Sequence, residues 1–546
     1  MSALSAWQQA MHALTSTGAP FETAEAEGVA RFIHAPATLN AALEQGRRHG
    51  ALDFTLWQDQ RLSFDDYFLA VDQVAAALLA RGIGRGSHVA IAMRNRPEWL
   101  IAFHAILKTG AVAVALNSWW QKDELSAALA DSGAGWLIAD ADRLQRLAGQ
   151  LEHIAVIGLD HAAPLDFSEV TAPLPTVWPH INPSDPAAIL FTSGTSARAK
   201  GVQLSQGALA QAVFTLDFFA AIGAMVQPEI VARVAGRRLK NLLAVPLFHV
   251  SGLVAQFFAG LRGGRLLVMM HRWDAGQALQ LIASEAITNF NGSPAMQVDL
   301  LNHPDFSADK LAGVIGLGYG GAAVPPTLSH ELGSKVPHAI QGSGYGMTES
   351  CGIGCVISGS LFAQNPEATG LSSPVVRLRV VDTLGNPLPF GMEGEVQLSG
   401  VTLMDGYVQD GQLQRSAFDG IWFASGDIGH LSADGLLTLT GRNKEVINRG
   451  GEKIALAEVE NCLVAHPDVL EAAAFPVADA RLGERLEAWV VMKPGAAFDA
   501  GAIHDFAANR LAAYKLPAAI RQHHAALPRN ATGKLLRREL DQARTA

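Results

Sequence analysis

The chain has 546 residues, of which 49% are hydrophobic and 17% charged, and its formal net charge is −10. This length predicts two to four domains at roughly 100–200 residues each, and the apolar content excludes a mainly disordered chain. The acidic balance argues against a nucleic-acid partner, and three cysteines are too few for a disulfide framework.

The first 31 residues and the most apolar stretch of the chain indicate the location of the protein in the cell. No Lys or Arg precedes Arg31, so the basic start of a secretory signal peptide is missing and a cytoplasmic protein is expected. Residues 241–261 carry no charged side chain, but Pro246, His249 and Gln256 interrupt them. Because polar groups are costly in lipid, we predict a buried strand, loop and helix here and no integral membrane segment.

Strand-like and helix-like stretches alternate along most of the chain. Apolar runs at 88–93, 111–116 and 135–140 alternate with amphipathic stretches at 97–110 and 122–133. This alternation predicts an α/β fold with largely parallel sheets. Residues 374–440 instead contain short strands separated by Asp-Gly and Gly-Asn turns, which predicts a smaller β-rich subdomain.

The alternating pattern returns after residue 441. We predict strands at 471–477 and 487–493 and a helix at 502–513. The chain therefore divides into a large N-terminal domain, residues 1–443, and a C-terminal domain, residues 444–546.

A Gly, Ser and Thr-rich loop at 191–202 follows the apolar run 187–190. Hydroxyl and backbone N–H groups beside a single lysine, Lys200, suit a phosphate ligand. The loop is not a Walker motif, because Ala199 and Gly201 stand where that motif requires Gly and Ser or Thr. A flexible surface loop is the alternative interpretation.

A second glycine-rich segment, Gly316–Gly321, has the spacing of a dinucleotide-binding loop. That fold requires a helix opening at the glycines and an acidic residue about 20 positions later. Pro325 and Pro326 intervene, and residues 332–348 contain no Asp or Glu. A nucleotide-dependent oxidoreductase remains only as an alternative.

Five further segments form a pattern with the loop at 191–202. They are YGMTES at 345–350, WFASGD at 422–427, GRNKEVI at 441–447, RGGEKIALAEVE at 449–460 and NATGK at 530–534. In this order they resemble the acyl-adenylate-forming (AMP-binding) superfamily of acyl-CoA synthetases, amino-acid adenylation domains and beetle luciferases. The resemblance extends from about residue 35 to 540 and implies stacked sheets in the large domain and a small mobile α+β C-terminal domain.

The resemblance also implies a reaction. ATP adenylates a carboxylic acid and pyrophosphate leaves, and then a thiol, usually that of coenzyme A, displaces AMP. An ATP- and Mg²⁺-dependent acyl-CoA synthetase is the leading hypothesis. Its partners would be small molecules only, and the protein would be either a monomer or a homodimer. The alternatives are transfer of the acyl group to a carrier protein and a non-catalytic relative that binds ATP.

Individual positions acquire roles from the same resemblance. Glu349 and Thr195 would hold Mg²⁺, for which oxygen ligands are suited. Ala197 and Ala199 replace a Gly and a Pro of the family's phosphate loop. The expected ATP and AMP contacts are Thr192, Ser193, Gly194, Thr195, Ser196, Lys200, Gly320, Gly321, Ala322, Tyr345, Gly346, Met347, Thr348, Asp427 and Arg442.

Two lysines and two glycines are assigned to the two half-reactions. Lys534 resembles the lysine that bridges the attacking carboxylate and the nucleotide, where a positive charge stabilises the transition state. Lys444 occupies the position of the hinge about which the C-terminal domain rotates. Gly450 and Gly451 would face the pantetheine arm of coenzyme A.

The acyl pocket is expected near His249, Gly318 and Gly346. The string Phe248-His-Val-Ser lacks the Asp that amino-acid-activating members use to bind the substrate ammonium. Gly346 stands where acetate-specific members carry a Trp. The remaining substrates are medium- or long-chain fatty, alicyclic or aromatic acids, whose burial is worth about 0.8 kcal/mol per CH₂.

Overall fold

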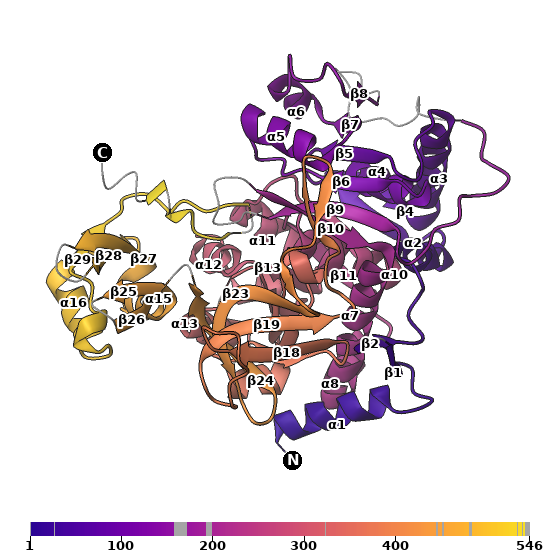
Figure 1. The fold of residues 1–546 in the computed structure, drawn as a ribbon. Coiled ribbons are helices and arrows are strands. Elements are labelled where there is room, and N and C mark those ends of the chain that lie inside the picture. The colour runs from indigo at the N-terminus through magenta and orange to yellow at the C-terminus, as the bar shows by residue number, and fades with distance from the viewer. Residues whose placement is uncertain are drawn as a thin grey trace.

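The computed structural model describes residues 2–540 except 27, 158–171, 193–198, 323, 444–445, 450–451, 480–482, 532 and 538. Two large sheets and their helices form a body, and a smaller sheet lies to one side of it (Figure 1). This mixed α/β architecture confirms the predicted fold class.

The first sheet has eight strands. The strands β9, β6, β5, β7 and β8, which are neighbours in that order, run parallel. The runs at 88–93 and 111–116 become its central strands because their side chains are apolar and buried on both faces. Its order is β21 (Gln412–Gln414), β20 (Gly406–Gln409), β10 (Lys200–Ser205), β9 (Pro186–Thr192), β6 (Val112–Ala115), β5 (His88–Ala92), β7 (Trp136–Ala139) and β8 (Ala155–Val156).

Four helices occur before or between the strands of this sheet in the chain, and α4 packs on β5 and β6. They are α3 (Phe64–Ala80), α4 (Pro97–Lys108), α5 (Lys122–Ser132) and α6 (Ala141–Arg146). Residues typical of helix ends begin or end three of these helices. Ser63 accepts a hydrogen bond from Asp66 N and so caps α3, and Pro97 occupies the first turn of α4. Gly133, with φ of 64°, ends α5 in the left-handed conformation.

The second sheet is parallel at its centre and antiparallel on one side. The predicted β-rich segment at 374–440 extends this sheet as β18, β19, β23 and β24, but its hairpin β20–β21 pairs with β10 in the first sheet. The order is β18 (Val376–Val381), β19 (Gly394–Gly400), β23 (Trp422–Leu431), β24 (Leu436–Arg442), β17 (Gly370–Ser372), β16 (Cys355–Ser358), β15 (Ile340–Tyr345), β14 (Gly316–Tyr319), β13 (Asn289–Gly292), β11 (Lys240–Leu243), β12 (Leu266–Met269), β3 (Asp53–Trp57) and β4 (Gln60–Ser63), with β22 (Phe418–Asp419) on β23.

The uncharged stretch at 241–261 forms a buried strand, loop and helix, as predicted. It contains β11 and then α9 (Val250–Gly252), the π-helix η3 (Leu253–Phe258) and α10 (Ala259–Arg262). Among the described residues only α7 (Gln206–Val226) is long and apolar enough to cross a membrane, and half of its most apolar window is buried in the protein. The remaining helices of the second layer are α8 (Pro228–Val234), α11 (Ala275–Ser284), α12 (Pro294–Asn302), α13 (Pro326–Lys335) and α14 (Gly359–Gln364).

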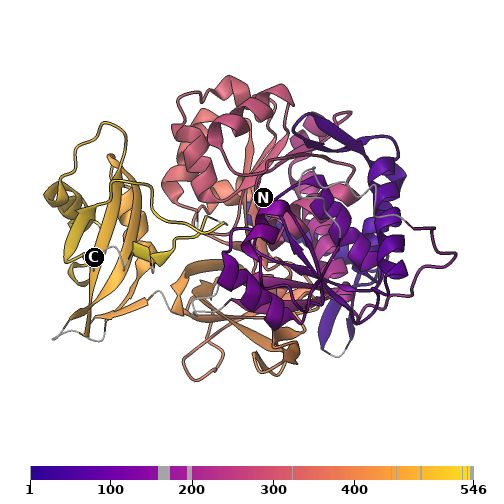
Figure 2. The same cartoon turned by 90° about the horizontal axis from the view of Figure 1, so that it is seen from above.

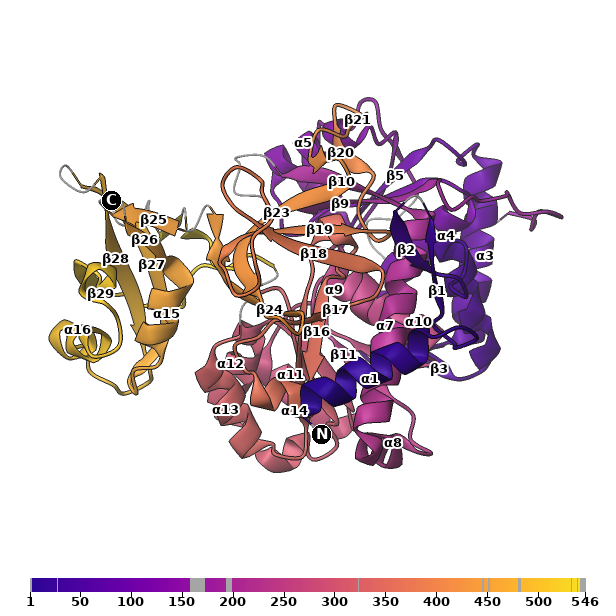
Figure 3. The same ribbon diagram turned by 60° about the horizontal axis from the view of Figure 1, so that its bottom comes forward.

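The N-terminal residues cover α7. Helix α1 (Ala3–Thr15) packs on α7 and α14 (Figure 3). Its Trp7 is fully buried. Strands β1 (Thr23–Ala26) and β2 (Val29–Phe32) and helix α2 (Leu39–Glu44) follow. Phe21 and Phe32 pack against two phenylalanines of α7 at ring-centroid separations of 5.0–5.5 Å. This aromatic cluster fixes the N-terminal segment to the core.

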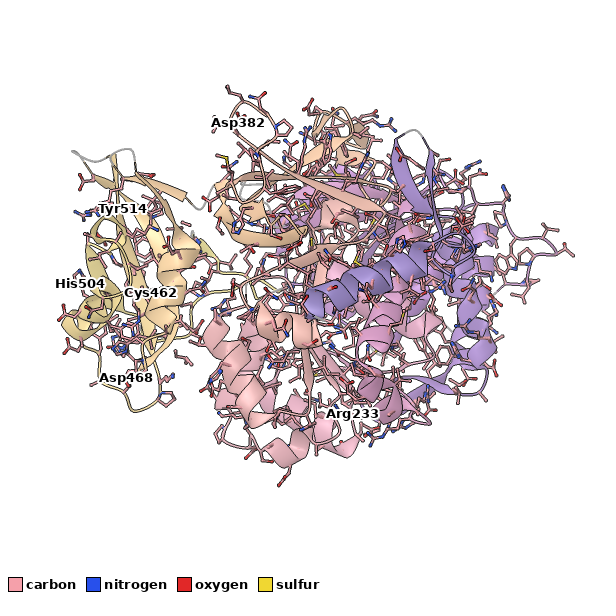
Figure 4. The ribbon with its side chains drawn as sticks, turned by 90° about the horizontal axis from the view of Figure 1, so that it is seen from below. Arg233, Asp382, Cys462, Asp468, His504 and Tyr514 are labelled. Atoms are coloured by element: carbon pink, nitrogen blue, oxygen red, sulfur yellow. The ribbon has the colours of Figure 1, made fainter. Side chains whose placement is uncertain are left out.

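The C-terminal unit is a five-stranded sheet with two helices (Figure 2). The helix predicted at 502–513 is found at Ala500–Ala508. It begins there because the Asp499 side chain accepts hydrogen bonds from Gly501 N and Ala502 N and so caps the helix. Figure 4 labels Cys462, His504 and Tyr514 on this unit, whereas Cys351 and Cys355 are buried in the body. Its elements are β25 (Val446–Arg449), β26 (Glu452–Ala455), α15 (Leu456–Val464), β27 (Val469–Asp479), β28 (Gly483–Met492), α16 (Ala500–Ala508) and β29 (Ala519–Gln522).

Candidate active site

The ends of three parallel strands define the site. Strands β13, β14 and β15 run side by side, and their carboxyl ends lead into Ser293, Gly320 and Gly346. In open α/β sheets ligands bind outside the carboxyl ends of the strands. A cavity of about 570 Å³ lies there, bounded also by the end of β9.

Most of the predicted site residues that the structure describes line this one cavity. Ala322 is exposed beside Gly321, and Lys200 faces Thr192 across the β9–β10 pair. Ser193, Gly194, Thr195, Ser196, Lys444, Gly450 and Gly451 lie outside the described residues. The residues lining the cavity are Thr192, His249, Gly318, Gly320, Gly321, Tyr345, Gly346, Met347, Thr348, Glu349, Arg442 and Lys534.

Asp427 does not line the cavity itself but contacts two residues that do, Arg442 and Tyr345. It lies opposite Arg442 in the β23–β24 pair, and Arg442 Nε is 2.7 Å from its Oδ1. The Tyr345 hydroxyl donates to Asp427 Oδ2 at 2.8 Å. Burial raises the pKa of Asp427, and the nearby Arg442 cation opposes that rise. A buried carboxylate held in this way can accept hydrogen bonds from ligand hydroxyl groups.

Glu349 forms a polar end of the cavity. It lies in the short 3₁₀ turn η5 (Thr348–Ser350), and its backbone carbonyl accepts a hydrogen bond from Met404 N at 2.8 Å. The Tyr407 hydroxyl donates to Glu349 Oε1 at 2.9 Å, and Lys200 Nζ lies 4.7 Å from the centroid of the Tyr407 ring. Tyr407 belongs to none of the sequence motifs and could not be predicted from them. It reaches Glu349 only because strand β20 pairs with β10.

The surroundings of Glu349 suit a magnesium ion. Burial raises the pKa of this carboxyl group, and the Tyr407 hydrogen bond and the Arg442 charge offset that rise only in part. The described residues contain no group of three or more His, Cys, Asp or Glu side chains that could hold a metal by themselves. Mg²⁺ is commonly bound by one or two carboxylates together with substrate phosphates, which this arrangement permits.

Lys534 reaches the cavity on a loop from the C-terminal unit. The loop is fixed by hydrogen bonds from Asn530 N to Lys534 O and from Lys534 N to Asn530 Oδ1, at 2.8 and 2.9 Å. Gly533 has φ of 80°, and a Cβ on it would lie 2.4 Å from Ser293 Oγ. The absence of a side chain at Gly533 therefore allows the loop to lie against the body and Lys534 to enter the site.

His249 lies in the wall of the cavity between β11 and α9. Its ring packs on Phe248 at 4.7 Å, and desolvation lowers its pKa to about 4. The side chain is therefore neutral at pH 7, so it acts as a hydrogen-bonding group and not as a cation toward a bound acid.

The neutral state of His249 predicts how stability depends on pH. The unfolded chain takes up a proton near the ordinary pKa of 6.5, whereas the folded protein does so only near 4, so stability falls as the pH is lowered across this window. Between pH 7.5 and 5, wild type should lose roughly 1–2 kcal/mol more unfolding free energy than His249→Gln. Urea unfolding at both pH values measures this difference. His504→Gln, at a half-exposed site on α16, is the control, and equal losses in wild type and His249→Gln would contradict the prediction.

Of the two glycines expected at the acyl pocket, Gly346 was predicted to leave room for the acid, but protein atoms occupy the space beside both glycines. A Cβ on Gly318 would lie 2.1 Å from Asn291 Oδ1, and one on Gly346 would lie 2.2 Å from the carbonyl oxygen of Gly352. The missing side chains thus accommodate Asn291 and the backbone at Gly352. Both glycines line the cavity, but neither opens additional space.

The segment Gly316–Gly321 does not form a dinucleotide-binding turn. Its first four residues are strand β14, and the next helix, α13, begins only at Pro326. The glycines therefore lack the helix N-terminus that would receive a pyrophosphate. This arrangement removes the structural basis for an oxidoreductase.

Comparisons with known proteins agree with this geometry. A family model described as AMP-binding enzyme matches residues 40–408, and one described as AMP-binding enzyme C-terminal domain matches residues 458–534. An indoleacetate–CoA ligase of Aromatoleum aromaticum is 30% identical over 515 residues, which cover 92% of this chain and 96% of that protein. A 4-coumarate–CoA ligase of Humulus lupulus is 30% identical over 500 residues, or 88% of each chain.

A solved structure is also similar. O-succinylbenzoate coenzyme A synthetase from Bacillus subtilis, in complex with ATP and magnesium ion, has a TM-score of 0.75 and 28% identity. The alignment covers 92% of this chain and 99% of that one.

Proposed function

The chain belongs to the AMP-binding enzyme family, and we propose that its cavity activates an apolar carboxylic acid as an acyl adenylate and then as a coenzyme A thioester. It is an AMP-forming acid–CoA ligase that uses ATP, Mg²⁺ and coenzyme A. We place the reaction in the cytoplasm, where ATP and coenzyme A are both available.

One observation supports this proposal most strongly. A lysine from the C-terminal unit, Lys534, lines the same cavity as the acidic residue Glu349 and the half-buried His249. A carboxylate and a triphosphate repel each other, so their reaction requires positive charge between them. The cavity provides this charge next to a wall that can receive an acyl group.

In the first step, a carboxylate oxygen attacks the α-phosphorus of ATP, and the bond to the β-phosphate breaks to release pyrophosphate. Lys534 would stabilise the charge on the attacking oxygen and on the phosphorus centre. Arg442 and Asp427 would hold the nucleotide through its ribose and phosphate. Glu349 would hold Mg²⁺, which neutralises the phosphate oxygens when bound.

In the second step, the sulfur of coenzyme A attacks the acyl carbon. The carbon–oxygen bond to AMP breaks, AMP leaves, and the thiol proton passes to solvent. The thiol needs access to the acyl carbon, so we propose that the loop carrying Lys534 withdraws at this stage. The predicted hinge, Lys444, and the predicted tunnel glycines, Gly450 and Gly451, would serve this movement.

The acid is proposed to be aromatic, alicyclic or a fatty acid of medium or greater length. The names of the relatives, indoleacetate–CoA ligase and 4-coumarate–CoA ligase, favour the aromatic class. Desolvated His249 and the absence of an acidic residue in Phe248-His-Val-Ser support an acid without an ammonium group.

A screen of carboxylic acids tests the proposal. We expect pyrophosphate release that requires both ATP and one class of acid, and a thioester that mass spectrometry detects only when coenzyme A is added. Persistent acyl-AMP in the presence of coenzyme A would indicate a carrier protein as the acceptor. ATP binding without pyrophosphate release for any acid would contradict the proposal and favour a non-catalytic relative.

A further inference from the structure

The wall of the cavity contains a turn of π-helix, η3, between α9 and α10. Such turns are rare and occur frequently at functional sites, since the extra residue redirects side chains. Gln256 lies in this turn, lines the cavity and is 1% exposed. Glutamine side chains are mostly exposed in proteins, so a buried one needs hydrogen-bond partners for its amide.

The amide of Gln256 has a defined orientation. Its Nε2 donates to the backbone carbonyl of Asn291 at 3.2 Å. A carbonyl can only accept, so the atom facing Asn291 must be the nitrogen. The other amide atom, Oε1, has no hydrogen-bond partner among the described residues. An acceptor left unpaired in a buried position destabilises the protein, and a ligand that donates to it would remove that cost.

The position of Gln256 indicates which part of a ligand it meets. Asn291 precedes the end of β13 by one residue and Ser293, which follows that strand end, by two, a distance of about 7 Å at the usual strand rise. Gln256 therefore lies deeper in the sheet than the strand ends, where Gly320 and Gly346 face the cavity. The acyl group is the apolar, uncharged part of the adenylate, so it suits this end of the cavity better than the charged nucleotide does.

The neighbouring wall carries no charge and is partly apolar. Val250, Val254 and Leu317 line the cavity beside Gln256. Of the lining residues that the structure describes, the charged ones are Glu349, Arg442 and Lys534, which belong to the nucleotide end. A neutral donor, and not an ammonium group, matches these surroundings.

We propose that the acid carries a neutral O–H or N–H group on the part of its acyl skeleton remote from the carboxylate, and that this group donates a hydrogen bond to Gln256 Oε1. The inference rests on the proposed adenylation of an acid in this cavity. Gln256 is then a specificity-determining residue, because a site built to bind a hydroxyl group rejects an analogue that leaves its own polar atom unpaired.

The test compares acids that differ only in this donor. Each pair carries a hydroxyl or a methyl group at the same carbon, in para- and meta-substituted phenylacetic and phenylpropionic acids and in ω-substituted linear acids. The two groups are similar in size, so the ratio of kcat/KM for pyrophosphate release reports the hydrogen bond. We expect at least one hydroxyl acid to be preferred by about 10-fold or more, the equivalent of about 1.4 kcal/mol.

Two variants assign that preference to one residue. Gln256→Met, which keeps the side-chain volume, should lower the hydroxyl-to-methyl ratio by about 10-fold, largely by improving the methyl acid. Gln297→Met is the matched control. Gln297 is also fully buried and also has an unpartnered Oε1, but it does not line the cavity, so the ratio should not change.

Calorimetric binding of the same acids to the ATP-loaded protein separates this inference from the proposed function. A hydroxyl preference in binding, without pyrophosphate release, would contradict the proposed function and retain the role of Gln256. Preference for the methyl acid in every pair, or a ratio that Gln256→Met leaves unchanged, would overturn the role of Gln256. Binding of no acid at all would overturn both.

Discussion

Replacing Lys534 with alanine is expected to lower acid-dependent pyrophosphate release by roughly 10²–10³-fold in kcat, because one preorganised charge at a reacting centre is worth about 3–4 kcal/mol. The loop at 530–534 already holds Lys534 in the cavity with Glu349 and Arg442, so little energy is needed to position it during the reaction. Thioester formation from supplied acyl-AMP should continue, because the α-phosphorus no longer reacts in that step. Separate assays of the two half-reactions measure both effects.

Lys515→Ala is the control for this substitution. Lys515 belongs to the same C-terminal unit but forms an ion pair with Glu458 at 2.6 Å, away from the cavity. Both half-reactions should survive in this variant. An equal loss of the two half-reactions in Lys534→Ala would show that the lysine does not act specifically in adenylation.

The second large effect is expected for Glu349→Gln. The amide keeps the side-chain volume and can still accept the hydrogen bond from the Tyr407 hydroxyl, but it has no negative charge for a cation. We expect kcat/KM for adenylation to fall by about 100-fold or more, since a metal contributes several kcal/mol of charge stabilisation at phosphate oxygens. A titration of activity against Mg²⁺ concentration should show a higher half-saturation point.

Asp405→Asn is the matched control for Glu349→Gln. Asp405 is a neighbouring carboxylate whose pKa burial also raises, and it accepts a hydrogen bond from Gln203 Nε2 at 3.2 Å, but it does not line the cavity. This variant should retain the Mg²⁺ dependence of wild type. If Glu349→Gln reduced activity with an unchanged Mg²⁺ requirement, Glu349 would have a structural role and not a metal-binding one.

Much of the fold follows from local patterns in the sequence. The strands at 88–93, 111–116 and 135–140 and the helices between them occur where apolar periodicity predicts them, because burial on one or both faces determines their residue types. The pairing of β20, residues 406–409, with β10, some 200 residues earlier, was not predictable in this way. Register across such a separation depends on tertiary packing, for which neither short strand carries a signal.

The candidate site was predictable to different degrees at its two ends. Asp427, Arg442, Glu349 and Lys534 occur in motifs, so the sequence could nominate them, and the structure brings them to one place. The acyl wall has no such motif. At Gly346 an absent side chain suggested space, whereas the structure places the backbone carbonyl of Gly352 there.

Gln256 and Tyr407 were missed for related reasons. A glutamine in an apolar helix is conspicuous only when its burial and its hydrogen bonds are known. A tyrosine in a short strand is recognised as part of the site only from the carboxylate that its hydroxyl contacts. Both depend on contacts between elements that are distant in the chain.

The close contact of Gly533 with Ser293 has a consequence for the energetics of the whole enzyme. Only arrangements in which residues 529–534 lie on the body bring these two positions together. A methyl group at Gly533 would penalise those arrangements and leave all others unaffected, while its φ of 80° adds backbone strain to the same side of the equilibrium. In the proposed two-step cycle, a methyl group at Gly533 would therefore shift the balance away from the arrangement used for adenylation and toward the one open to the thiol.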